Sequence, residues 1–420
     1  MSFNPFNERP EKIDSGFMDW AKMYPRSYDK NDVDPYTKVR CILLNGTEYE
    51  ATWFSHQFHR HCADNDVRRE LALIRKNEQQ QQKRIACLKP INETILETTI
   101  SYEQLAVDLT AILAQREPNA YVKRALDFAL LEDFDHLYRY SDLLDMEQGI
   151  HAERLVGSYT ELTPGRPTIA HHRYGYDDVK RYTDFKTADP ITKLNVAIIT
   201  AAEQQTMNYY MNQAAFYTTD LGRRLYSEIG MVEEQHVTQY GSLMDPNESW
   251  LACWLNHEYT ECYLYYSCYK DETDPYIKKI WEQHLIMEIA HLHKVAEIMK
   301  NVEKREWQSV IPNGDFPELL AFGPQKEYVR SILKNTVTLT ATMEDYVTVN
   351  ALNNDSKFFF FQNVVNKEIE SVPSHMVIDR YIKEFGKDYR FEDTKSPVPE
   401  LQDRKRDNTT LGRVKEKVNA

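Results

Sequence analysis

Three stretches of the chain repeat one arrangement of potential metal ligands. In each stretch an acidic residue is followed thirty positions later by a second acid, and a histidine stands three residues after that acid. The three sets are Glu103 with Asp133 and His136, Glu203 with Glu233 and His236, and Glu258 with Glu288 and His291. Residues three apart on a helix share a face, so each second acid can bind an ion together with its histidine. Two such sets would supply four carboxylates and two imidazoles, enough to enclose two metal ions.

The first two sets belong to an internal repeat with an offset of 100 residues, in which Glu103 corresponds to Glu203 and His136 to His236. Within each copy, the two acids lie equally far from a turn expected near residue 118 or residue 218. The two acids therefore meet at the same height of a helical hairpin.

The acids of the repeat also interrupt apolar stripes. Glu203 shares a helical face with Ile199, Met207 and Tyr210, so its carboxylate should point into the core. A buried charge without a partner costs several kcal/mol. Ion pairs with buried Lys or Arg would be one solution, but the core-facing neighbours include few basic residues. The pattern therefore favours metal ions as the partners.

Two pairings of the three sets are open. The first joins the sets at 103–136 and 203–236, and the second joins 203–236 to 258–291. We favour the first pairing because a long connection over 146–188 can cross a bundle, whereas the short turn at 245–247 cannot. The expected metal ligands are then Glu103, Asp133, His136, Glu203, Glu233 and His236, with Glu258, Glu288 and His291 as the alternative second half.

Long helices must position these residues. The chain has only 13 glycines, and its apolar periodicity predicts three helical hairpins, over 93–116 with 120–145, 190–217 with 220–244, and 249–270 with 275–303. We therefore expect a helical bundle over 91–304. An N-terminal extension over 1–90 should contain a short β-hairpin at 40–54, centred on Asn45-Gly46, and a polar helix at 65–85. A C-terminal extension over 305–420 should be mixed helix and loop with a mobile charged tail.

Composition excludes several classes of partner. The net charge of −14 disfavours nucleic acid and anionic membranes, and no uncharged apolar run is long enough to cross a bilayer. The six cysteines form no CxxC pair, so thiolate metal sites and a disulfide framework are not expected. The N-terminal residues contain no apolar signal segment. We expect a cytoplasmic protein that binds neither nucleic acid nor membrane.

The ligand sets, together with the strings AEQQTMNYY and VEEQHVTQY, resemble the ferritin-like superfamily, and in particular its rubrerythrin and di-iron carboxylate branches. The resemblance covers about half of the chain, from 93 to 303. It implies an all-α fold: a ferritin-like four-helix bundle, here with an additional helical hairpin and terminal extensions. It also implies two iron ions, with manganese as the alternative, and an oxidoreductase that acts with dioxygen or peroxide and a small-molecule substrate.

The sequence departs from that family in having Asp at 133, an extra hairpin and no cysteine-rich module. An external electron donor is therefore expected, and a homo-oligomer is compatible with the resemblance. The alternative function is an iron-handling protein or a helical scaffold that keeps the bundle without redox turnover.

Overall fold

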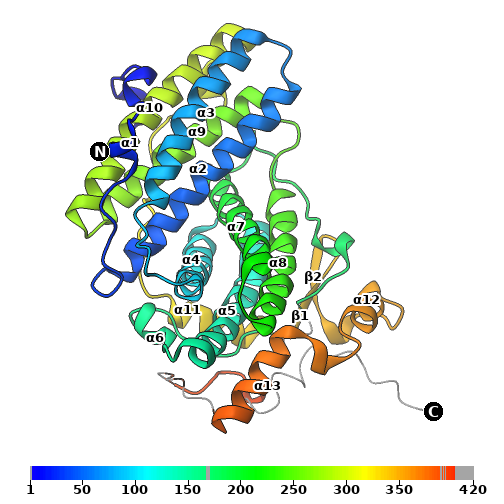
Figure 1. Cartoon of the computed structure of the whole chain (residues 1–420). Helices are drawn as coiled ribbons and strands as arrows, with labels where there is room; N and C mark the ends of the chain where they lie inside the picture. The colour runs from blue at the N-terminus through cyan, green and yellow to red at the C-terminus, as the bar shows by residue number, and fades with distance from the viewer. Residues whose placement is uncertain (1, 167–170, 388–389, 391, 393, 403–420) are drawn as a thin grey trace. The chain divides into compact units, whose positions relative to one another are not determined.

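The computed structural model describes residues 2–166, 171–387, 390, 392 and 394–402, and most of them are helical (Figure 1). This confirms a mainly α-helical fold. The α-helices are α1 (Trp20–Met23), α2 (Pro35–His61), α3 (Asn65–Ala86), α4 (Ile95–Arg116), α5 (Ala120–Gln148), α6 (Ala152–Leu155), α7 (Pro190–Phe216), α8 (Asp220–Gly241), α9 (Trp250–Asp271), α10 (Pro275–Glu303), α11 (Lys326–Thr336), α12 (Lys357–Val365) and α13 (Pro373–Phe385). No helix in this part of the chain is both long and apolar enough to cross a membrane.

The described residues contain one small antiparallel sheet, which the sequence did not predict. Strand β1 (Leu339–Thr342) pairs with β2 (Asp345–Thr348), and Leu339 lies opposite Thr348. Short 3-10 turns are η1 (Pro5–Asn7), η2 (Ile13–Gly16), η4 (Gly175–Asp178), η5 (Trp307–Ser309), η6 (Val349–Ala351), η7 (Ile369–Ser371) and η8 (Pro399–Leu401). The charged tail expected to be mobile falls mainly in 403–420, outside the described residues.

Local capping fixes where the long helices begin. A side chain at the N-cap accepts a backbone N–H from the first turn in α2, α3, α4, α5, α8, α9 and α10, the caps being Asp34, Asp64, Thr94, Asn119, Thr219, Ser249 and Asp274. At the start of α4, Glu97 completes a capping box with Thr94. The caps fix the residue at which each helix begins, and therefore where each hairpin turns. The position of each candidate acidic ligand along its hairpin follows from this.

The chain divides into two compact units. Unit 1 comprises Met1–Glu93, Thr183–Gln205 and Met244–Phe322, and unit 2 comprises Thr94–Tyr182, Thr206–Leu243 and Gly323–Ala420. The division falls inside α7, whose first residues belong to unit 1 and whose last residues belong to unit 2.

In unit 1 the α2–α3 hairpin packs against the α9–α10 hairpin, and Figure 1 shows these four long helices side by side. Aromatic rings join α2 to α9, with Phe58 stacked on Trp250 at a centroid distance of 5.5 Å. At the far end of α9, the buried Arg40 of α2 donates from Nε to Glu272 at 3.0 Å.

The β-hairpin predicted at 40–54 is wrong, because these residues form the middle of α2. Asn45-Gly46 does not turn the chain. A Cβ on Gly46 would lie 3.2 Å from the side chain of Gln205, so the glycine allows α7 to approach closely. Asn45 adds a hydrogen bond by donating to Gln205 Oε1 at 2.8 Å. The residues that favour a turn in isolation therefore serve helix packing here.

In unit 2, α4 and α5 form a hairpin, and α8 packs against α5. The second half of α7 approaches α8 at Gly230, where a Cβ would lie 3.3 Å from Met211 Sδ. From the C-terminal part of the chain, α11 packs on α5, and α13 packs on both α5 and α8. The connection over 146–188, expected to be at least partly irregular, contains α6 and η4 among its described residues.

Candidate metal centres

Unit 2 brings together five of the six favoured ligands. They are Glu103 of α4, Asp133 and His136 of α5, and Glu233 and His236 of α8, each at most 1% exposed. His136 Nδ1 and His236 Nδ1 each lie 3.0 Å from a different oxygen of Glu233. Ligand atoms of Glu103, His136 and Glu233 lie within 4.8 Å of one another, as do those of Asp133, Glu233 and His236. The contact between His136 and Glu233 joins α5 to α8, which belong to the first and second predicted hairpins.

The second nitrogen of His236 is held by a carboxylate outside the predicted set. His236 Nε2 lies 2.7 Å from Glu132 Oε2, while its Nδ1 lies 3.2 Å from Asp133 Oδ1. A neutral imidazole that donates from Nε2 to Glu132 presents a lone pair at Nδ1. That lone pair faces two carboxylates, an arrangement that calls for a cation or a second proton between them.

Two arginines neutralise Glu132. Arg166 Nη1 donates to Glu132 Oε1 at 2.8 Å, and Arg173 Nη1 donates to the same oxygen. Burial alone would raise the pKa of Glu132, but Arg173, Arg166 and His236 together hold it well below its usual value. Glu233 behaves similarly, since its hydrogen bonds with His136 and His236 outweigh burial and lower its pKa to about 2. By contrast, burial raises the pKa of Asp133.

Sequence reasoning missed these arginines because they lie in the connection over 146–188. Gly165 brings this connection against α5, since a Cβ at that position would lie only 2.6 Å from the carbonyl oxygen of Leu131. The Gly165 N–H also donates to Asp135 Oδ1 at 2.8 Å. The sequence analysis expected few basic residues beside the core-facing acids, but Glu132 has two, Arg166 and Arg173. The Pro-Gly-Arg string at 164–166 was the available signal.

Tyrosine supports one ligand of unit 2. Tyr210 Oη donates to Glu103 Oε1 at 2.6 Å, and burial together with Glu103 raises the pKa of Tyr210 well above its usual value. The rings of Tyr140 and Tyr226 lie 5.2 Å and 5.7 Å from that of Tyr210. Tyr210 is thus held in a cluster of tyrosine rings while its hydroxyl contacts Glu103.

The sixth favoured ligand, Glu203, is buried on α7 in the stretch that belongs to unit 1. It precedes Tyr210 by seven residues, so the two side chains share a face of that helix. Its part in a metal centre stays a prediction from the sequence.

The alternative ligands gather in unit 1 with residues from the N-terminal hairpin. Glu258, Glu288 and His291 lie beside Glu48 of α2, Glu78 of α3 and Glu261 of α9, and all six side chains are at most 1% exposed. His291 Nδ1 lies 3.0 Å from Glu288 Oε2 and 3.8 Å from Glu258 Oε2. Ligand atoms of Glu78, Glu258 and His291 lie within 4.8 Å of one another, as do those of Glu258, Glu261 and Glu288. These six residues are called the unit 1 cluster below.

The α2–α3 hairpin is a fourth copy of the sequence arrangement. Glu48 and Glu78 are thirty residues apart, and Gln81 stands where the other copies have histidine. Gln81 Nε2 donates to Glu48 Oε1 at 3.1 Å and also to Glu288 Oε1. The thirty-residue spacing could have identified this copy. The glutamine and the apparent turn at Asn45-Gly46 concealed it.

The electrostatics of the unit 1 cluster differ from those of unit 2. Within the described residues, none of its five glutamates forms an ion pair with Lys or Arg. Burial and the neighbouring carboxylates raise the pKa values of Glu48, Glu258 and Glu261 well above the usual range. Burial likewise raises the pKa of Glu78, to about 7.

Comparison of the chain with protein-family models, with curated proteins and with solved structures finds no match.

Proposed function

We propose that the chain is a ferritin-like oxidoreductase whose unit 2 holds a dinuclear centre of iron, with manganese as the alternative metal. Its ligands in unit 2 would be Glu103, Asp133, His136, Glu233 and His236. The observation that carries the proposal is the convergence of two imidazole Nδ1 atoms on the single buried carboxylate of Glu233. A mixed set of carboxylates and imidazoles suits iron and manganese.

The residues of the chain would perform distinct tasks around such a centre. Two redox-active ions would supply electrons for the reduction of dioxygen or peroxide. Glu132 fixes the orientation of His236, because it accepts a hydrogen bond from Nε2 and is itself fixed by Arg166 and Arg173. Tyr210 restrains Glu103 through its hydroxyl. Tyr140 and Tyr226, which pack near the ring of Tyr210, would help to keep water from Glu103.

The second candidate function is a helical scaffold or iron-handling protein without redox turnover. The buried arginines favour it, because Arg166 and Arg173 already balance Glu132. If His136 and His236 both carry two protons, Glu233 can pair with them in the absence of metal.

Metal analysis of matched variants tests the proposal. Glu233→Gln removes the carboxylate that both imidazoles face, whereas Glu234→Gln changes its exposed neighbour. After anaerobic loading with iron(II), the Glu233→Gln variant should bind less iron than wild type and consume dioxygen more slowly. The Glu234→Gln variant should match wild type in both measurements. Equal iron in all three proteins would contradict the proposal, and unchanged binding without dioxygen consumption would favour an iron-handling role.

A further inference from the structure

The unit 1 cluster contains carboxylate oxygens for which the described protein provides no donor. No N–H group or hydroxyl of the described residues donates to either oxygen of Glu261 or to the Oε2 atoms of Glu48 and Glu258; Glu261 instead faces the carboxyl of Glu288, and Glu48, Glu258 and Glu261 are fully buried. The nearest basic group to Glu261 is His257, whose Nε2 lies 3.6 Å from Oε1. Such oxygens are costly in a dry core unless protons or cations neutralise them.

The imidazole of His291 is arranged as a metal ligand. Its Nε2 lies 3.1 Å from Asn77 Oδ1, an amide oxygen that can only accept a hydrogen bond. With the amide in this orientation, Nε2 of the neutral ring carries the hydrogen, and the Nδ1 lone pair is directed at Glu288 and Glu258. In metal sites, a partner of this kind sets which nitrogen of a histidine binds the ion.

We propose that unit 1 holds a second metal centre, built by α2, α3, α9 and α10 and separate from the centre proposed in unit 2. Its ligands are Glu48, Glu78, Glu258, Glu261, Glu288 and His291. Five carboxylates and one imidazole form an oxygen-rich set, which suits divalent cations such as Mn²⁺ and Fe²⁺ rather than soft ions. The inference rests on contacts within unit 1 and does not depend on the function proposed for unit 2.

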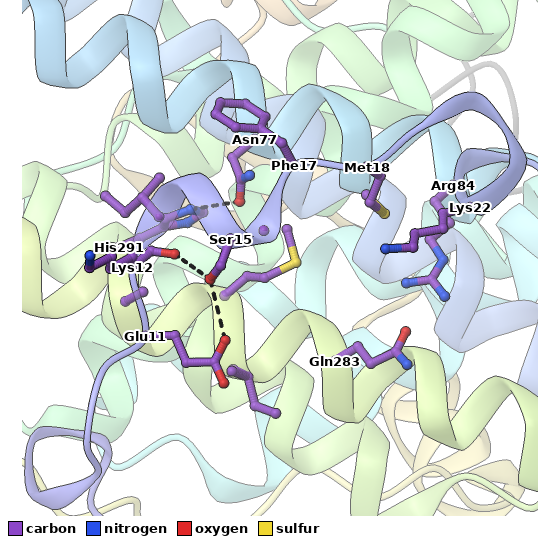
Figure 2. A pocket seen from close by; sticks show the side chains of 15 residues that line it. Glu11, Lys12, Ser15, Phe17, Met18, Lys22, Asn77, Arg84, Gln283 and His291 are labelled. Atoms are coloured by element: carbon purple, nitrogen blue, oxygen red, sulfur yellow. Dashed lines mark hydrogen bonds between the residues drawn. The ribbon is translucent and has the colours of Figure 1, made fainter.

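A cavity in unit 1 borders this centre. It has a volume of about 320 Å³ and lies between the N-terminal segment, α3 and α10 (Figure 2). Asn77 and His291 belong to its lining, so the cavity borders the cluster where these two side chains form their hydrogen bond. Gly16 borders Asn77 closely, since a Cβ there would lie 3.0 Å from the amide atoms of that side chain.

Titration of the metal-free full-length chain with Mn²⁺ tests the second centre. Bound manganese would be measured by equilibrium dialysis and elemental analysis, in wild type and in the double variant Glu258→Gln/Glu261→Gln. We expect the double variant to lose the manganese of unit 1, with an affinity reduced by at least about tenfold, the loss that even supporting residues cause. His291→Ala should behave in the same way. His293→Ala is the matched control, because its imidazole lies on the same helix but contacts the carbonyl oxygen of Pro5.

Variants of the two units separate this proposal from the preceding one. His236→Ala removes a ligand of unit 2 only, so it should retain the manganese that the Glu258→Gln/Glu261→Gln variant loses. Manganese should also raise the unfolding temperature of the His236→Ala variant, because an ion that binds only the folded state stabilises it. The proposal is overturned if the folded double variant binds as much Mn²⁺ as wild type. Should the double variant not fold, failure of Mn²⁺ to raise the unfolding temperature of His236→Ala overturns it equally.

Discussion

Individual glutamates in this chain are buried to the same extent but neutralised in different ways. Glu132 and Glu261 are both fully buried. Glu132 accepts hydrogen bonds from Arg166, Arg173 and His236. By contrast, no N–H group or hydroxyl of the described residues donates to Glu261, which faces the carboxyl of Glu288. The sequence alone does not distinguish these two glutamates, because Glu132 is next to the candidate ligand Asp133 and Glu261 is three residues after the candidate ligand Glu258. The difference depends on whether a remote segment brings a guanidinium group to the site.

Glu132→Gln should destabilise unit 2, because it leaves Arg166 and Arg173 facing a neutral amide in a dry core. Removal of one partner from a buried ion pair typically costs about 3–5 kcal/mol. Chemical denaturation of the metal-free protein would measure the change. Glu234→Gln, at an exposed position on α8, should stay within about 0.5 kcal/mol of wild type. Equal stability of the two variants would show that the arginines do not need Glu132.

Glu272 should make the stability of unit 1 depend on pH. Burial raises the pKa of this carboxyl, but the Arg40 guanidinium outweighs burial, so the folded-state pKa lies below the usual value. A carboxyl whose pKa is lower in the folded protein than in the unfolded chain stabilises the fold when the pH is above the unfolded-state pKa, which is about 4.3 for Glu. This stabilisation is lost as the pH falls through the pKa of the folded state. Wild type should therefore be more stable than Glu272→Gln at pH 7, and the difference should shrink as the pH approaches 3. A difference that is constant over this range would contradict the assignment.

At the scale of elements, the hairpins were largely predictable. The predicted helix at 120–145 corresponds to α5, and the predicted helix at 275–303 coincides with α10, because apolar periodicity and N-caps are local signals. The helix predicted at 65–85 corresponds to α3, but α2 escaped prediction because Asn45-Gly46 favours a turn unless another helix packs on the glycine. The arginines of unit 2 escaped because their contacts with α5 are made by an irregular segment, which periodicity cannot describe.

The connection over 146–188 should therefore be sensitive to substitution at the glycine where it meets α5. Gly165→Ala places a Cβ 2.6 Å from the Leu131 carbonyl oxygen, so the segment must move and withdraw Arg166 from Glu132. We expect unit 2 to lose about 1–3 kcal/mol of stability, the usual cost of overpacking. Gly175→Ala in the same connection is the control, because a Cβ there meets no atom within 4 Å. Thermal unfolding of both variants gives the comparison, and identical midpoints would show that the segment adapts freely.

At the scale of the whole molecule, one sequence arrangement occurs in four hairpins that are distributed over two units. The hairpins containing Glu48 and Glu258 contribute to unit 1, and those containing Glu103 and Glu233 contribute to unit 2. The two units need not have the same role. The candidate centre of unit 2 combines two imidazoles with nearby buried arginines, whereas the unit 1 cluster combines five carboxylates with one imidazole. This contrast is the reason for proposing different roles for the two candidate centres.

Because each unit has its own compact core, local damage should loosen one unit before the other. Glu272→Gln breaks an ion pair within unit 1, so backbone amides of α2, α3, α9 and α10 should exchange hydrogen faster than in wild type. Gly165→Ala should instead accelerate exchange in α4, α5 and α8. In α7, the amides of 190–205 should follow unit 1, and those of 206–216 should follow unit 2. Hydrogen exchange measured by mass spectrometry on both variants resolves these segments. Uniform acceleration throughout the chain in both variants would mean that the two units unfold as a single cooperative body, and that a metal bound in either unit stabilises the whole chain.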